Sequence, residues 1–186
     1  MDRGSYIEYE GRPAVRFQRS YPHPPERLWA AVTEPGELAH WFPSAVRMEQ
    51  HVGGRVEFSD DPHMEPTSGT VLVHEPPHRL AFTWAGDELH FHIEPSDDGG
   101  CTLTLIDVLD AGNTAARNAA GWTVCLDELG KRLSGQPSDG PHGESAAAWR
   151  PLYESFVAAG MPSGAPLPGP SGELVDPGEL GLPGGA

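Results

Sequence analysis

The spacing of apolar residues changes once along this chain, near Asp110, and this change constrains the fold more strongly than any other feature. Between residues 44 and 110, large apolar residues alternate with polar ones, which is typical of β-strands that bury one face. These apolar positions are Val46, Met48, Val56, Phe58, Leu80, Phe82, Trp84, Leu89, Phe91, Ile93, Leu103 and Leu105. Short turns rich in Gly, Pro and Asp separate the segments, so we expect neighbouring strands to run antiparallel.

After Asp110 the period becomes 3.6 residues, the period of an amphipathic α-helix. Its apolar face consists of Trp122, Leu126, Leu129 and Leu133. Asn113 or Thr114 can cap the start of this helix, and Gly135 can end it. Such a helix is about 33 Å long, which is enough to cross a whole sheet.

The N-terminal part supplies one extended segment and two short helices. Residues 6–19 read as extended chain around a turn, and Pro25 suits the first turn of a helix that Pro35-Gly36 ends. A second helical turn is expected over residues 37–42. We therefore predict an α+β protein, in which a curved antiparallel sheet of about seven strands wraps one long C-terminal helix.

Glycine and proline divide the C-terminal part of the chain into further units. Residues 1–135 form the main predicted domain, residues 136–145 a linker, and residues 146–160 an accessory helix with Pro151 in its first turn. Residues 161–186 are rich in Gly and Pro and carry few large apolar side chains. We expect this last segment to be disordered, because it cannot bury enough surface to offset the entropy lost on ordering.

Charge and cysteine content exclude several classes of function. The chain has 12 Lys and Arg against 27 Asp and Glu, a formal charge of −15. This excess of acid argues against binding to nucleic acid or to an anionic membrane, since both need clustered cations. Two cysteines, Cys101 and Cys125, cannot form a disulfide framework, and residues 1–20 lack a signal-peptide pattern. We expect a cytoplasmic protein.

Five segments together resemble a known superfamily. Residues 25–33, 38–42, 53–56, 69–84 and 121–129 resemble the SRPBCC (START-related, helix-grip) superfamily, and within it the branch that is like the activator of heat-shock protein 90 ATPase homologue. The resemblance implies a seven-stranded antiparallel sheet that grips a long helix around a hydrophobic tunnel. It also implies relatives that include lipid carriers, polyketide aromatases and cyclases, hormone receptors and co-chaperone domains. No catalytic signature is shared across this branch, so we carry none over and assign no catalytic residue.

Asp107 is the polar residue whose predicted position carries most functional interest. If its strand keeps the alternation of Leu103 and Leu105, the carboxyl group points inward, beside the expected cavity. Arg19 is a candidate partner, since the resembling fold pairs the first and last strands. A bulge after Ile106 that turns Asp107 to solvent, or a structural ion pair, are the alternatives.

Aromatic residues form the second part of the candidate binding site. With Asp107, the predicted ligand-binding residues are Trp41, Phe58, Phe82, Trp84, Phe91 and Trp122. Such residues are most often simply core, but in a helix-grip fold core and pocket wall are the same surface. Trp84 and Trp122 are preferred because they come from opposing elements.

The sequence Glu88-x-His90-x-His92-x-Glu94 places four polar side chains on one face of a strand. This pattern could hold zinc, but Leu89, Phe91 and Ile93 on the other face must be the buried ones. We therefore read the four polar residues as a solvent-exposed face, and expect no metal and no cofactor.

Three classes of function remain open. The leading hypothesis is a protein that binds a small hydrophobic molecule in a cavity between the sheet and the C-terminal helix. A cyclase- or aromatase-like enzyme would use the same cavity with Asp107 as its acid or base. A protein-interaction module of co-chaperone type would instead use the acidic outer face of the sheet, and a homodimer or another protein partner also remains open.

Overall fold

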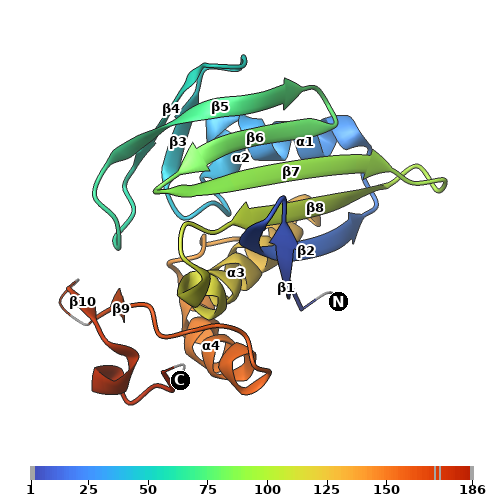
Figure 1. The fold of residues 1–186 in the computed structure, drawn as a ribbon. Coiled ribbons are helices and arrows are strands. Elements are labelled where there is room, and N and C mark those ends of the chain that lie inside the picture. Colours follow the sequence, from blue (N-terminus) through green and yellow to red (C-terminus); the bar gives the residue numbers. More distant parts are fainter. Residues whose placement is uncertain (1–2, 170, 172, 185–186) are drawn as a thin grey trace.

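The structure, a computed structural model, describes residues 3–169, 171 and 173–184. Its main sheet consists of β1 (Ser5–Tyr9), β2 (Arg12–Tyr21), β3 (Ala45–Met48), β4 (Arg55–Ser59), β5 (Thr67–Glu75), β6 (Arg79–Trp84), β7 (Asp87–Pro95) and β8 (Cys101–Val108). These eight strands are all antiparallel to their neighbours, in the order β1-β2-β8-β7-β6-β5-β4-β3. The helices are α1 (Pro25–Thr33), α2 (Pro35–Leu38), α3 (Ala115–Leu133) and α4 (Trp149–Ala158). The predicted α+β architecture, with a curved sheet around one long helix, is confirmed (Figure 1).

The sheet has eight strands rather than about seven, because the N-terminal extended segment folds back on itself. Glu10 and Gly11 turn the chain between β1 and β2 with positive φ angles of 50° and 79°. β2 then pairs with β8, so that Val15 lies opposite Asp107 and Arg19 opposite Leu103. This pairing of early and late strands fixes which side chains share the inner face.

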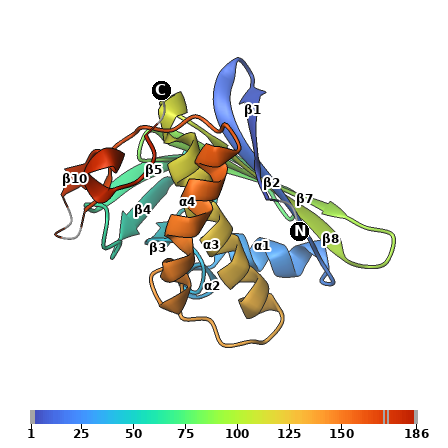
Figure 2. The same ribbon diagram turned by 90° about the horizontal axis from the view of Figure 1, so that it is seen from below.

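The long helix α3 begins and ends where the sequence predicts. Thr114 is its N-cap residue, and Gly135 follows its end with a φ of +74°. Its 19 residues span about 28 Å. Figures 1 and 2 show α3 between the sheet and α4, so that one side of α3 faces the strands and another faces α4. No helix in the described part of the chain is both long and apolar enough to cross a membrane.

The short helix α2 lies earlier than predicted. The sequence predicts a helical turn over residues 37–42, but α2 starts at Pro35, which occupies the first helical position, and ends at Leu38. Proline is favoured there because its missing N–H would have no partner in the first turn anyway. The following turn places Trp41 and Phe42 in the core, where both are buried.

Residues 161–186, for which the sequence predicts disorder, contain short elements where the structure describes them, while residues 170, 172, 185 and 186 lie outside the described residues. Short strands β9 (Leu167–Pro168) and β10 (Leu174–Val175) pair, and the Tyr153 hydroxyl of α4 donates a hydrogen bond to the Pro183 carbonyl oxygen (3.0 Å). Leu167 and Leu182 are buried against the core. These contacts connect the described part of the segment to α4 and to the core.

Candidate ligand-binding site between the sheet and α3

Asp107 lies at the centre of a buried polar network between β8 and α3. Its side chain is fully buried, and its Oδ2 accepts hydrogen bonds from Trp122 Nε1 (2.8 Å) and Asn118 Nδ2 (3.0 Å). β8 pairs without interruption with both neighbours here, so the alternative of a bulge that exposes Asp107 is wrong. Asp107 Oδ1 is buried and accepts no hydrogen bond from any described residue.

A second carboxyl group, that of Asp87 at the start of β7, shares this network. Asn118 Nδ2 donates to Asp87 Oδ2 (2.9 Å) as well as to Asp107, and the Asp110 backbone N–H donates to Asp87 Oδ1 (2.8 Å). Burial, reinforced by the negative charge of Asp87, raises the pKa of Asp107 to about 8. Burial also raises the pKa of Asp87, although hydrogen bonds from Asp110 and Asn118 and the charge of Arg117 act to lower it. Asp107 is therefore protonated at neutral pH, and its carboxyl group shares a hydrogen bond with that of Asp87.

The predicted aromatic residues meet in the same interior. Trp41, Phe58, Phe82, Phe91 and Trp122 are buried, whereas Trp84 at the end of β6 is partly exposed. Ring centroids lie 5.5 Å apart for Trp84 and Trp122, and 5.8 Å apart for Phe82 and Phe91. The preferred pair from opposing elements is thus in direct contact.

The sequence analysis missed the residue that joins these rings. Phe42 lies 5.6 Å from both Trp84 and Trp122, 6.1 Å from Phe58 and 6.3 Å from Phe82, measured between ring centroids. The sequence pattern selects its neighbour Trp41, but nothing in a short apolar pair after a helix indicates that both side chains point inward. Asn118 was also missed, although it lies one helical turn before Trp122 and so shares its face.

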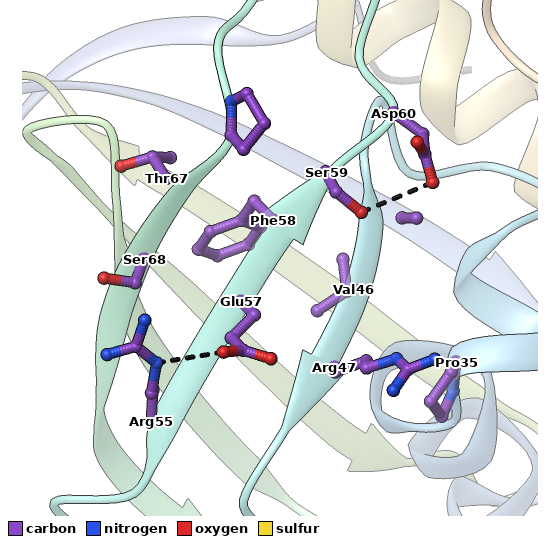
Figure 3. A pocket seen from close by; sticks show the side chains of 12 residues that line it. Pro35, Val46, Arg47, Arg55, Glu57, Phe58, Ser59, Asp60, Thr67 and Ser68 are labelled. Carbon is purple, nitrogen blue, oxygen red and sulfur yellow. Dashed lines mark hydrogen bonds and ion pairs between the residues drawn. The ribbon is translucent and has the colours of Figure 1, made fainter.

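Aromatic rings fill the space between the sheet and α3. Two pockets are described, and neither is lined by a residue of α3. The larger, about 770 Å³, is an open groove over β3, β4 and β5, where Arg47, the Arg55–Glu57 ion pair and Ser68 line it (Figure 3). The other, about 440 Å³, lies beside Asn113 and Met161. Of the predicted ligand-binding residues, only Phe58 lines either of them.

Trp84 is the one partly exposed ring among the predicted binding residues. Its indole Nε1 is buried and has no hydrogen-bond partner within the described part of the chain. Directly after it, Ala85 and Gly86 turn the chain with φ angles of 50° and 93°. Trp84 therefore lies at the edge of the aromatic interior, beside a turn, with one polar atom unsatisfied.

The candidate pairing of Arg19 with Asp107 is wrong. Arg19 does point inward from β2, but its Nη1 lies 3.4 Å from Asp127 Oδ1 on α3. Arg19 lies opposite Leu103, which is four residues from Asp107 along β8, or about 13 Å in an extended strand. The alternation of side chains correctly placed Arg19 on the inner face of the sheet. It did not indicate how far Arg19 lies from Asp107 along that face.

The polar face of β7 is only partly exposed to solvent, less than the sequence predicts. Glu88 pairs with Arg12, and the His90 ring packs against Tyr9 with ring centroids 5.1 Å apart. His92 is partly buried, and Glu94 is exposed. Among the described residues, no group of three or more His, Cys, Asp or Glu side chains is arranged to hold a metal ion.

A curved antiparallel sheet closed by one long helix, with an aromatic interior and a buried acid, defines the class of START-related helix-grip proteins. The family model for Activator of Hsp90 ATPase homolog 1-like proteins matches residues 22–134. The chain belongs to this family. None of the curated proteins compared with it matches.

Solved structures with the same fold include proteins from several bacteria. CalU16 from Micromonospora echinospora is 21% identical with a TM-score of 0.63, over 85% of this chain and 96% of CalU16. EF2215 from Enterococcus faecalis is 16% identical with a TM-score of 0.67, over 83% and 91% of the two chains. DynU16, a protein of the dynemicin biosynthetic locus, is 27% identical with a TM-score of 0.59, over 68% of this chain and 50% of DynU16.

Proposed function

We propose that this protein binds a small hydrophobic molecule between the sheet and α3, with Trp84 and Trp122 against its apolar body and Asp107 fixing its orientation. The observation that carries the proposal is the Asp107 carboxyl group, which is fully buried inside an aromatic interior and whose Oδ1 accepts no hydrogen bond from the described residues. A hydroxyl group on a ligand would form a further hydrogen bond with this carboxyl group.

Binding requires that a ring of the protein moves, because the interior is filled by its own side chains. Trp84 is the ring that we expect to swing outward, since it is partly exposed and its Nε1 has no partner among the described residues. A ligand ring would then replace the contacts that Trp122 and Phe42 lose. The affinity comes from ligand surface removed from water, about 25 cal/mol per Å².

The comparisons support a small-molecule ligand rather than a macromolecular one. DynU16 belongs to a biosynthetic locus, that of dynemicin. The chain's formal charge of −15 disfavours nucleic acid as the partner.

Thermal unfolding with paired ligands tests the proposal. Naphthalene and 2-naphthol differ by one hydroxyl group, and both should raise the melting temperature, 2-naphthol more than naphthalene. Asp107→Ala should abolish the preference for 2-naphthol but keep the stabilisation by naphthalene. Glu88→Gln, on the outer face, is the matched control and should behave like the natural protein. If neither compound raises the melting temperature, or if Asp107→Ala keeps the preference, the proposal fails.

The paired carboxyl groups also favour a second candidate, an enzyme that uses the same interior. The pKa of about 8 lets Asp107 give or take a proton near neutral pH. On this hypothesis Asp107→Asn would retain ligand binding and lose turnover of the bound compound. A pure binding protein would return each ligand unchanged, which mass spectrometry of the bound fraction detects.

A further inference from the structure

A second polar side chain, Arg19, points into the interior from β2 and lacks adequate partners. Its side chain is 10% exposed, and its Nε and Nη2 atoms are buried without a hydrogen-bond partner in the described residues. Only Nη1 has a partner there, Asp127 Oδ1, at 3.4 Å. A guanidinium group carries five N–H donors, so most of its hydrogen-bonding capacity is unused here.

Asp127 is a weak partner for this cation. The distance of 3.4 Å is long for a charge-assisted hydrogen bond, and the Asp127 side chain is 41% exposed. Burial raises the pKa of Asp127 even though Arg19 lies beside it, which indicates that the pair does not compensate for desolvation. A buried charge without a proper counter-ion is strongly destabilising. An anion that bound beside Arg19 would therefore stabilise the protein.

Arg19 lies at the rim of the interior, where a ligand headgroup can reach it. It shares the inner face of β2 with Phe17, which is deeply buried, and with Tyr21, which is only partly buried. Besides Asp127, Tyr21 is a titratable group that faces Arg19, and burial raises the pKa of Tyr21, so that it remains neutral.

We propose that Arg19 binds the carboxylate of the ligand, which makes the ligand an apolar carboxylic acid. This inference rests on the proposed function, because it assigns the headgroup of the molecule that the interior would hold. The planar guanidinium group suits a carboxylate through two parallel hydrogen bonds, with Nε and Nη2 on the same edge. The apolar part would extend from Arg19 towards Asp107 and Trp84, over about 13 Å along the strand.

The test compares two probes of equal length, decanoate and 1-decanol, by titration calorimetry at pH 7. The natural protein should bind decanoate at least tenfold more tightly than decanol, the smallest effect expected for hydrogen bonds to a charged group. Arg19→Met should remove this preference and leave the affinity for decanol unchanged. Arg16→Met, on the same strand but on the opposite face, should keep the preference. Asp127→Asn should tighten decanoate binding, because it removes the carboxylate that competes for Arg19.

The two probes separate the two proposals. If decanol binds and decanoate binds no better, the carboxylate assignment is overturned while the hydrophobic site stands. If Arg19→Met keeps the preference for decanoate, the assignment to Arg19 is likewise overturned. If neither probe binds the natural protein, both the carboxylate ligand and the hydrophobic site are rejected for chains of this length.

Discussion

Replacing Asp107 by asparagine should change how the stability of the protein depends on pH. Burial, with the charge of Asp87, raises the pKa of Asp107 from 3.8 to about 8 in the folded state. Between these two values the unfolded chain has lost the proton and the folded chain keeps it. Stability of the natural protein should therefore fall as pH rises, by about 1.4 kcal/mol per pH unit for one proton. Across the whole interval the loss amounts to roughly 6 kcal/mol.

The asparagine side chain of the Asp107→Asn variant has the shape of the protonated acid but does not titrate. Its amide oxygen can accept the hydrogen bonds of Trp122 and Asn118, and its NH₂ group can replace the hydrogen bond that the protonated Asp107 shares with Asp87. Urea unfolding at pH 5, 6, 7 and 8 should then show that the free energy of unfolding of the variant rises, relative to that of the natural protein, with each increase in pH.

Glu88→Gln is the control for this measurement. Burial alone would raise the pKa of Glu88, but hydrogen bonds from Arg12 and His90 outweigh burial and lower it. The contribution of Glu88 to stability therefore has the opposite sign to that of Asp107, and is lost as pH falls. A difference between Asp107→Asn and the natural protein that is the same at pH 5 and pH 8 would refute the reasoning.

Two further substitutions test the packing around the site. Phe42→Ala removes the ring that contacts Trp84, Trp122 and Phe58, and should lower the free energy of unfolding by about 3–5 kcal/mol in urea titrations. A loss below about 1 kcal/mol would contradict the conclusion that the Phe42 ring joins the aromatic interior. Glu128 is buried and accepts hydrogen bonds from Lys131, from Ser138 (2.7 Å) and from Ser145, which together outweigh burial and lower its pKa. Glu128→Gln should increase amide hydrogen exchange over residues 136–145 while the sheet stays protected, and unchanged exchange there would show that Glu128 does not hold this loop.

Hydrophobic periodicity predicted the parts of the fold that depend on which face a side chain occupies. The inward position of Asp107 follows from Leu103 and Leu105, because side chains two residues apart on a strand share a face. The helical spacing from Trp122 to Leu133 likewise predicted α3 and its buried side. Both inferences are local, and need no knowledge of distant elements.

The contacts that the sequence did not predict depend on how distant elements align. The pairing of Arg19 with Asp127 depends on the position of α3 along the sheet, which no local pattern encodes. Phe42 lies in a turn, where neither the strand nor the helix period applies. The position of Asp87 beside Asp107 comes from a residue that the sequence marks only as part of a turn, Gly86-Asp87.

The indole N–H resonances of the five tryptophans give the most direct test of whether a ligand enters between the sheet and α3. On titration with 2-naphthol, the Trp84 and Trp122 resonances in a ¹⁵N-correlated NMR spectrum should shift, since these rings would contact the ligand. The resonance of Trp149, which packs on Tyr153 in α4, should stay in place. Saturating 2-naphthol that leaves the Trp84 and Trp122 resonances unmoved, or that shifts Trp149 instead, would contradict a binding site in this interior.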